Sequence, residues 1–300
     1  MYFDTAGGPV FRPPSEAESF ILRVTIGCSH NRCTYCNMYR TVDFRIRTMD
    51  EIMAQVNRAK EYKDVIRRIF LADGNALVLP TDQLLVILRI LEDSFPKLRR
   101  VSCYAGPNDI LRKTPEELHR LAEAGLKLVY YGMESGDDEV LQHVNKGVTA
   151  GQSIAAGQKV VAAGIKLSLM VIIGLGGKRR SIQHACHTAQ AVNAIKPSML
   201  SALTLMMYRG SELRAEYERG EFEILSPAEA MGELYRLIRG IELPQGSHCL
   251  FRSNHISNYV ALAGTLPQDK EQLLANSQKA IEHLAAMTDW DPYNNVERDN

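Results

Sequence analysis

Hydrophobic and polar positions along the chain change repeatedly between two patterns, which predicts strands and helices in alternation. Short apolar runs rich in β-branched residues read as buried strands, and the segments between them place apolar residues at helical spacing. The strand-like runs are residues 19–27, 68–72, 100–105, 126–131, 165–173 and 199–206. The helical segments are residues 49–62, 81–94, 114–125, 138–143, 149–163, 180–195, 211–219, 226–241 and 267–287. This alternation predicts an α/β fold with parallel strands and helices outside the sheet.

The segment after the first strand narrows the choice among α/β folds. It reads GCSHNRC and lacks the G-x-G-x-x-G pattern of an open dinucleotide-binding sheet. A full or partial (β/α) barrel is therefore the better prediction. We expect an N-terminal arm over residues 1–18, a barrel core over residues 19–245, and a closing segment over residues 246–300 with a short strand at 249–252 and a helical extension. Thr81 is expected to N-cap the helix that follows it.

Composition and charge exclude several classes of protein. Hydrophobic residues make up 45% of the 300 residues, and 35 Lys and Arg balance 35 Asp and Glu. This balance argues against a general phosphate-binding surface, so a nucleic-acid partner is not indicated. The longest apolar segment, residues 167–175, is shorter than the roughly 20 residues of a membrane span, and no secretory signal is visible. The sequence therefore predicts a cytoplasmic protein without a membrane segment.

Three of the six cysteines lie in a short loop directly after the first predicted strand. Cys28, Cys33 and Cys36 form a C-x4-C-x2-C pattern. Loops after the strands form the active face of a β/α barrel, and closely spaced thiolates can wrap an iron–sulfur cluster. Three ligands leave one iron of a cubane free for a reaction. Zinc is an alternative, because His30 offers a fourth ligand, and a disulfide or chance clustering are others.

The cysteine loop and the barrel-like alternation resemble the radical S-adenosylmethionine (radical SAM) superfamily. The usual family loop is C-x3-C-x2-C, so this loop has one extra residue between Cys28 and Cys33. The architecture resembles the branch that contains elongator subunits, methylthiotransferases and anaerobic coproporphyrinogen oxidase. The resemblance covers about residues 19–210 and implies two cofactors, a 4Fe–4S cluster and S-adenosylmethionine. In the family, one electron from the cluster cleaves the sulfonium, and the resulting 5′-deoxyadenosyl radical removes a hydrogen atom from the substrate.

The resemblance assigns cofactor contacts to residues around the first half of the barrel. Tyr35 stands where the family often has an aromatic residue before the third cysteine. Asp73, Gly74 and Asn75 follow the second strand and resemble the turn that binds the methionine amino group. Their alternative is a plain turn, because D-G-N is strong turn chemistry. Glu134 lies in a G-x-E-S-G segment after the fourth strand, where the family has an acid near the cofactor; the alternative is a helix-capping turn.

Three further residues are assigned in the same way. Ser168 lies in a strand where the family often has a polar residue facing the cofactor. Gly174 opens a G-L-G-G turn that resembles the adenine-packing turn of the family, and Arg209 follows the sixth strand, where it faces cofactor or substrate or is a solvated loop residue. Lys146 resembles part of an accompanying K-G-x-T element, with a helix-end cation as its alternative. The helix that holds His184, Cys186 and His187 should lie outside the barrel, so these residues are expected in the core or on the surface.

The sequence thus predicts an enzyme that reductively cleaves S-adenosylmethionine at Cys28, Cys33 and Cys36, with an unidentified small or macromolecular substrate. The resemblance implies an external electron donor such as flavodoxin or ferredoxin. Two alternatives come from other classes: a zinc-stabilised β/α binding module without catalysis, and an iron–sulfur electron carrier without S-adenosylmethionine chemistry.

Overall fold

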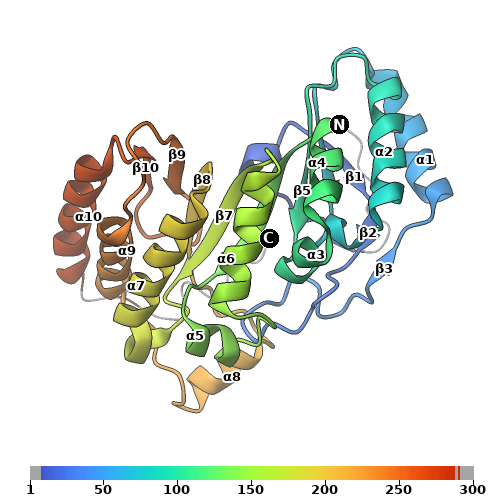
Figure 1. The fold of residues 1–300 in the computed structure, drawn as a ribbon. Coiled ribbons are helices and arrows are strands. Elements are labelled where there is room, and N and C mark those ends of the chain that lie inside the picture. The colour runs from blue at the N-terminus through green and yellow to red at the C-terminus, as the bar shows by residue number, and fades with distance from the viewer. Residues whose placement is uncertain (1–7, 288–289, 291–300) are drawn as a thin grey trace. The chain divides into compact units, whose positions relative to one another are not determined.

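The computed structural model describes residues 8–287 and residue 290, and its strands form an eight-stranded sheet (Figure 1). The strand order is β1-β4-β5-β6-β7-β8-β9-β10, and β2 pairs with β3 in a separate ribbon. The described pairs from β1 to β6 and from β7 to β9 are parallel, whereas β10 runs antiparallel to β9. This confirms the predicted α/β class with parallel strands. Because the order has two ends, it corresponds to the partial form of the expected barrel.

Most elements fall within the ranges that the sequence pattern predicts, but the helix at Pro107–Arg112 and the short strand at Arg45–Ile46 were not predicted. The strands are β1 (Phe20–Arg23), β2 (Thr25–Ile26), β3 (Arg45–Ile46), β4 (Arg68–Ala72), β5 (Arg100–Ala105), β6 (Leu126–Glu134), β7 (Lys166–Ile173), β8 (Met199–Thr204), β9 (Cys249–Ser253) and β10 (Leu262–Leu266). The α-helices are α1 (Met49–Ala59), α2 (Thr81–Ser94), α3 (Pro107–Arg112), α4 (Pro115–Glu123), α5 (Asp138–His143), α6 (Ala150–Ala162), α7 (Gly177–Ile195), α8 (Glu212–Glu218), α9 (Pro227–Gly240) and α10 (Lys270–Ala285).

Two local predictions are wrong for reasons that the hydrogen bonds show. Residues 19–27 do not form one strand, because the chain changes partners at Val24. Its N–H bonds to Ala72 at the end of β4, while its carbonyl accepts from Arg47 beside β3. Thr81 does not cap α2. It is the first residue of the helix, Pro80 holds the N-cap position, and the Thr81 hydroxyl accepts a hydrogen bond from the Lys113 ammonium at 3.2 Å.

The described residues separate into two compact units, each of which is considered by itself. The first comprises residues 8–31, 38–131 and 159–167, and the second comprises residues 32–37, 132–158 and the chain from residue 168. The cysteine loop contributes to both units, because residues 32–37 belong to the second.

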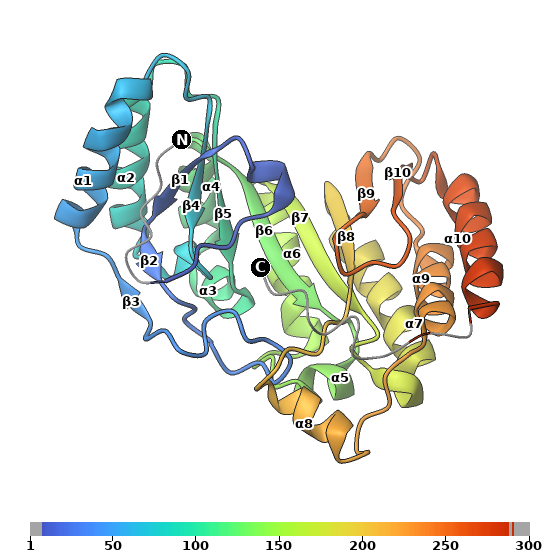
Figure 2. The ribbon, with the colours of Figure 1, turned by 180° about the vertical axis from the view of Figure 1, so that it is seen from behind.

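In the first unit, helices α1, α2 and α4 cover one face of strands β1, β4 and β5 (Figures 1 and 2). Capping boxes begin α1 at Thr48 and α4 at Thr114, where each threonine hydroxyl accepts from the backbone three residues on. The aromatic rings of Phe70, Tyr104 and Tyr130, on three neighbouring strands, meet edge to face with centroids 5.0 to 6.0 Å apart. These contacts fix the sheet from which the cysteine loop departs.

The N-terminal segment is packed against this sheet and is not the loose arm that the sequence predicts. A 3₁₀ helix at Pro14–Glu16 buries the Glu16 carboxylate completely. The Tyr130 hydroxyl donates to Glu16 Oε1 at 2.7 Å, and the Arg100 guanidinium lies 2.8 Å from the same oxygen. Figure 2 shows this segment crossing the strands on the face away from the helices. The part of the expected arm at residues 1–7 lies outside the described residues.

In the second unit, α7 and α9 pack against each other and α10 packs against α9 and β10. Ser226 and Glu229 form the capping box of α9. The sequence predicts a strand near Cys249 and a terminal helix, and both are present, but β10 was not predicted. Its sequence, LAGTL, contains a glycine and is too short to show alternation. The expected segment at residues 288–289 and 291–300 lies outside the described residues.

The helices within the described residues are too short or too polar to span a membrane.

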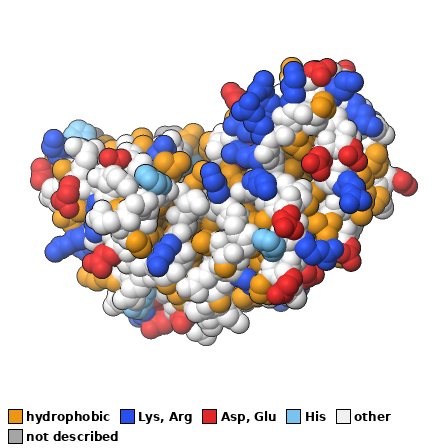
Figure 3. All heavy atoms as spheres, turned by 45° about the horizontal axis from the view of Figure 1, so that its top comes forward, with side chains coloured by type: hydrophobic (Ala, Val, Ile, Leu, Met, Phe, Trp, Pro, Cys, Tyr) orange, Lys and Arg blue, Asp and Glu red, His pale blue; other side chains and the backbone are white. Residues whose placement is uncertain are grey.

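Figure 3 shows a concentration of Lys and Arg side chains over the first unit. Exposed Arg67 and Arg99 precede β4 and β5, and the Arg99 N–H bonds to the Arg67 carbonyl at 2.8 Å. These arginines lie at the end of the parallel strands opposite to the one from which the cysteine loop leaves.

The Glu16 contacts give a stability prediction. Replacing Glu16 with Ala leaves Tyr130 and Arg100 without their buried acceptor, so the free energy of unfolding should fall by about 3 kcal/mol. Glu18→Ala is the control, because the exposed Glu18 carboxylate pairs with Arg68 at the surface and should cost at most about 1 kcal/mol. Urea denaturation of both variants measures the difference. Equal losses would show that the N-terminal segment does not stabilise the first unit.

Candidate cofactor site

In the first unit, a buried ion pair fixes the point where the cysteine loop begins. The Arg23 guanidinium at the end of β1 lies 2.7 Å from Asp73 Oδ2 after β4, and both side chains are fully buried. The same oxygen accepts the Gly27 N–H at 3.1 Å. The backbone directly before Cys28 is therefore held by a carboxylate from the neighbouring strand.

Gly74 lets the cysteine loop approach this turn closely. Its N–H bonds to the Gly27 carbonyl at 3.1 Å. A Cβ at position 74 would lie 2.8 Å from the Cys28 Cβ, which is closer than real contacts allow, and a tight 3.2 Å from its Sγ. Glycine is therefore required here for the close contact with Cys28 rather than for an unusual backbone angle.

Asn75 ties the loop to the end of β5. Its side-chain amide donates to the Ser29 hydroxyl at 2.9 Å and to Asp109 Oδ2, and its carbonyl oxygen accepts the Gly106 N–H at 3.1 Å. Asp109 and Ser29 were not singled out by the sequence. Both the amide nitrogen and the carbonyl oxygen of the Asn75 side chain are thus hydrogen-bonded, unlike those of an exposed D-G-N turn. The segment after β4 is therefore held against the cysteine loop.

The buried carboxylate of Asp73 is suited to a cationic ligand. Burial raises the pKa of Asp73, while the Arg23 guanidinium and the Gly27 N–H oppose that rise. Its second oxygen, Oδ1, is buried and has no hydrogen-bond partner among the described residues. A buried, unpaired carboxylate oxygen is rare in proteins, and an ammonium group would satisfy it. The carboxylate acceptor beside Cys28 therefore fits the amino group of S-adenosylmethionine.

In the second unit, residues 32–37 are anchored to the hydrophobic core. The ring of Tyr35 packs against a buried cluster that consists of Val140, Val144, Leu175, Leu205, Met207, Leu213 and Phe222. The Thr34 N–H bonds to the Val144 carbonyl, and the Thr34 carbonyl accepts from Leu213 N–H, both at 3.1 Å. Cys33 and Cys36, on either side of this anchor, stay partly exposed and form no disulfide.

Tyr35, Glu134 and the two thiols form one electrostatic group. Burial raises the pKa of Tyr35 well above its usual value, and the charges of Glu134, Cys33 and Cys36 raise it further. The tyrosine therefore stays a neutral hydroxyl that donates a hydrogen bond to Glu134. The structure thus brings together the aromatic residue, the acid and two of the three cysteines that the sequence singled out.

Glu134 has an unusual backbone conformation. Its φ is 67°, in the left-handed region that costs a non-glycine residue energy, and such residues are concentrated at functional sites. The carboxylate lies 2.9 Å from the Lys146 ammonium, and both side chains are nearly buried. A Cβ on Gly132 would lie 2.2 Å from Glu134 Oε1, so that glycine makes room for the folded-back side chain. Lys146 is therefore a partner of Glu134 rather than a solvated helix-end cation.

Arg209 reaches the same loop through its backbone. Its carbonyl accepts a hydrogen bond from the Asn37 side chain at 2.9 Å, while its own side chain is exposed. The neighbouring Tyr208 was missed by sequence reasoning. Burial raises the pKa of Tyr208, and the charge of Cys36 raises it further.

Gly174 and Ser168 lie at different ends of β7. Gly174 follows the strand with a positive φ of 86°, and its N–H donates to the fully buried Glu233 Oε1 at 2.6 Å. Ser168 is six residues earlier, about 20 Å back along an extended strand. It is buried beside Met199 at the start of β8. The structure therefore does not bring Ser168 to the edge where Gly174 lies.

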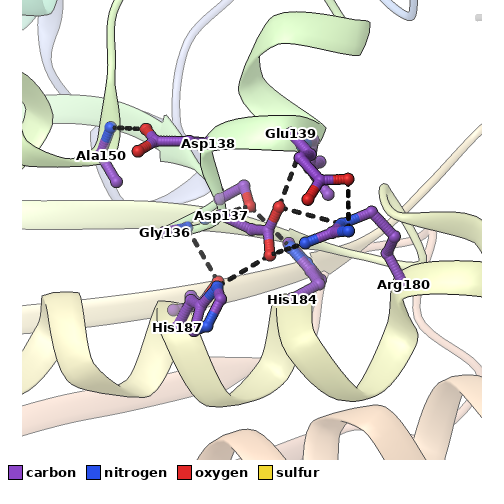
Figure 4. Close-up of polar contacts among 11 residues, drawn as sticks. Gly136, Asp137, Asp138, Glu139, Ala150, Arg180, His184 and His187 are labelled. Atoms are coloured by element: carbon purple, nitrogen blue, oxygen red, sulfur yellow. Dashed lines mark hydrogen bonds and ion pairs between the residues drawn. The ribbon is translucent and has the colours of Figure 1, made fainter.

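The segment after Glu134 continues into a cluster of charges on α5 and α7 (Figure 4). The Asp137 carboxylate N-caps α5 and lies 2.9 Å from the Arg180 guanidinium and 2.8 Å from His187 Nδ1. Burial alone would raise the pKa of Asp137, but the hydrogen bonds from Arg180, the Val140 N–H and His187 together lower it. His187 is therefore a helix-surface residue that holds the cap, as expected for the outer helix.

The predicted cysteine ligands are divided between the two units. Cys28 belongs to the first, and Cys33 and Cys36 belong to the second. No group of three His, Cys, Asp or Glu side chains in the described part of the chain is arranged as a metal site. The fit of the residues to a cluster therefore rests on the chemistry of each half, in which no cysteine is tied up in a disulfide.

Comparison with known proteins identifies the family. The Radical SAM superfamily matches residues 22–189, which is more than half of the chain and includes all three loop cysteines. The chain belongs to the radical SAM superfamily. The cofactors of this superfamily are a 4Fe–4S cluster and S-adenosylmethionine.

Individual relatives are distant. The chain is 24% identical over 233 residues to the heme chaperone HemW of Bacillus subtilis (strain 168), which covers 74% of this chain and 59% of HemW. It is 27% identical over 169 residues to the 4′-phospho-dehydrooxetanocin synthase of Priestia megaterium, covering 51% of this chain and 23% of the synthase. The radical SAM chain thus spans less than two thirds of the length of either relative.

Solved structures share the fold. The archaeal Elp3 of Methanocaldococcus infernus, with an N-terminal deletion, matches 89% of this chain and 63% of its own with a TM-score of 0.53 and 16% identity. Methylornithine synthase (PylB) matches 92% of this chain and 84% of its own with a TM-score of 0.52 and 12% identity. At these identities the likeness concerns the fold alone.

Gly74→Ala tests the close approach to Cys28. The added methyl group overlaps the Cys28 side chain, so the variant should bind markedly less iron after anaerobic reconstitution and lose about 1–3 kcal/mol of stability. Gly151→Ala is the control, because the nearest atom to a Cβ there is 3.8 Å away on the surface of α6. Iron and sulfide analysis of both proteins checks this. Full iron content in Gly74→Ala would show that the turn does not set the position of Cys28.

Asp137→Asn tests the electrostatics of the α5 cap. Because the folded-state pKa of Asp137 is lowered, its carboxylate stabilises the fold above its unfolded pKa of about 3.9, and that contribution is lost as the pH falls through the lower folded value. The variant should therefore be less stable near neutral pH and lose less stability below about pH 4. Denaturant unfolding from acid to neutral pH measures this. Parallel curves for the two proteins would contradict the assignment.

Proposed function

We propose that Cys28, Cys33 and Cys36 hold a 4Fe–4S cluster whose fourth iron binds S-adenosylmethionine, and that the enzyme produces a 5′-deoxyadenosyl radical for an unidentified substrate. The observation that carries this proposal is the way each half of the cysteine loop is fixed. Gly74 closes on Cys28 in the first unit, and Tyr35 anchors Cys33 and Cys36 in the second. When bound, the cluster supplies the electron that cleaves the sulfonium.

The surrounding residues have defined parts in this proposal. Asp73 Oδ1 and the backbone around Gly74 would accept hydrogen bonds from the methionine ammonium. Glu134, held by Lys146 at 2.9 Å, would face the cofactor's polar groups, and the turn at Gly174 would pack beside adenine. Tyr35 keeps its proton because its pKa is raised, so it donates a hydrogen bond and adds no charge beside the thiolates.

The extra residue in the loop supports assignment to a subgroup. Asn31, between Cys28 and Cys33, has a φ of 44°, and its side-chain amide donates to the Tyr39 carbonyl at 2.8 Å. Asparagine tolerates this left-handed conformation better than most residues. We infer that the C-x4-C-x2-C loop accommodates its additional residue in this turn, within a branch like that of the elongator subunits and methylthiotransferases.

The proposal also includes an electron donor, a cellular location and a class of substrate. Reduction of the cluster needs an external one-electron donor such as flavodoxin or ferredoxin, which fits a cytoplasmic enzyme. The neutral overall charge supports a substrate other than long nucleic acid, because the 35 basic residues are balanced by 35 acidic ones.

Anaerobic reconstitution with cysteine variants tests the function. Wild-type protein should bind iron and sulfide, show visible absorbance that dithionite bleaches, and release 5′-deoxyadenosine from S-adenosylmethionine. Cys33→Ala should lose the cluster and the product together, because a cubane with two protein ligands is not retained. Cys186→Ala, at an exposed position on α7, should keep both.

The alternatives give different results. A colourless protein with one bound zinc would support a binding module, and a cluster that never produces 5′-deoxyadenosine would support an electron carrier. Iron retained equally by Cys33→Ala and Cys186→Ala would contradict the ligand assignment.

A further inference from the structure

A carboxylate and an imidazole are buried behind the turn at Gly174. Glu233 on α9 is fully buried, and its Oε1 accepts the Gly174 N–H at 2.6 Å. His184 on α7 is 1% exposed, and its Nε2 lies 3.0 Å from the Ile172 carbonyl oxygen and 3.5 Å from Glu233 Oε1. Two side chains from different helices thus hold two nearby backbone groups, the Ile172 carbonyl and the Gly174 N–H, where β7 ends.

The imidazole also reaches the segment that holds Glu134. His184 Nδ1 lies 2.7 Å from the Ser135 hydroxyl, and that hydroxyl accepts the Asp137 N–H at 2.9 Å. Ser135 is fully buried and directly follows the left-handed Glu134. Figure 4 shows His184 projecting from α7 toward this segment, beside the Asp137 cluster.

The partners determine the direction of each hydrogen bond. A carbonyl oxygen can only accept, so His184 Nε2 carries the proton that points to Ile172. In the neutral imidazole Nδ1 is then an acceptor, and the Ser135 hydroxyl donates to it. The Ser135 oxygen in turn accepts from Asp137. One continuous chain of donors therefore runs from the Asp137 N–H through Ser135 and His184 to the Ile172 carbonyl.

This arrangement is costly for a purely structural contact between α7 and α9. Burying a carboxylate disfavours its charged form, and an apolar pair of similar volume would pack the two helices without that cost. Burial accordingly raises the pKa of Glu233. What an apolar pair would not supply is an acceptor for the Gly174 N–H and a rigid link from Ile172 to Ser135.

We propose that His184 and Glu233 are positioning residues that couple the two cofactor turns, so that the backbone at Ile172–Gly174 and the carboxylate of Glu134 are set in one geometry for S-adenosylmethionine. The inference rests on the proposed function, because it assigns both turns to that cofactor. Neither residue touches the ligand; His184 acts through Ser135 and Ile172, and Glu233 acts through Gly174.

The test compares two substitutions of equal size at Glu233 in the reconstituted enzyme. Glu233→Met keeps the volume but removes the acceptor, whereas Glu233→Gln keeps both the volume and an oxygen for the Gly174 N–H. Equilibrium dialysis with S-adenosylmethionine should show about tenfold weaker binding for Glu233→Met and near wild-type binding for Glu233→Gln, with unchanged iron content in both.

A double-mutant cycle then tests the coupling. Ser135→Ala breaks the chain at its other end and should also weaken binding about tenfold, and the double variant Ser135→Ala/Glu233→Met should be little weaker than either single one. Leu237→Ala, which removes a buried side chain of α9 outside the network, is the stability control. It should lower the melting temperature without changing the affinity.

The outcomes distinguish failure of the proposed function from failure of the coupling between the two turns. Wild-type protein that binds no S-adenosylmethionine would overturn the proposed function and this inference with it. If wild type binds while Glu233→Met and Ser135→Ala bind equally well, the network is structural only. Affinity losses that multiply in the double variant to about a hundredfold would show two independent contacts and would overturn the coupling. If Glu233→Met does not fold, Ser135→Ala alone decides whether the chain affects affinity.

Discussion

The fully buried ion pair between Arg23 and Asp73 is the interaction on which the first half of the site depends. It joins the end of β1 to the end of β4 and uses the same carboxylate oxygen to hold the Gly27 N–H. A buried pair of this kind is destabilising when either partner is removed, because an uncompensated charge remains. The geometry of the cysteine loop therefore depends on the stability of the sheet. Gly74, next to Asp73 in the chain, contacts Cys28 directly.

In the second unit, hydrophobic packing holds the part of the cysteine loop that contains Cys33 and Cys36. Tyr35 lies against a buried cluster, and backbone hydrogen bonds hold Thr34 to α5 and to the start of α8. The two thiols beside this anchor remain partly exposed, as ligands for an inorganic cluster must. Buried polar contacts thus hold the part of the loop in the first unit, and an aromatic anchor holds the part in the second.

The sequence predicts the parallel α/β architecture and the bounds of β4, β5 and α2 because their apolar periods are uninterrupted, although Thr81 is not the cap of α2. It predicts the residues near the loop because their spacing and family resemblance are specific. It does not reveal that Asp73 forms an ion pair, that Glu134 has a left-handed backbone, or that Ser168 lies at the far end of β7. Glu233 and Tyr208 are missed for a related reason. Nothing in the spacing of either residue distinguishes it, and Glu233 is brought to Gly174 only by the packing of α9 against α7.

We propose that the three cysteines leave one iron of the cluster open for S-adenosylmethionine. Electron paramagnetic resonance of the dithionite-reduced, reconstituted protein, recorded with and without the cofactor, measures this. We expect the signal of a single reduced 4Fe–4S cluster whose g-values change when S-adenosylmethionine is added. A cluster signal that the cofactor leaves unaltered, in protein with full iron content, would show that no iron is available to the cofactor and would rule the proposal out.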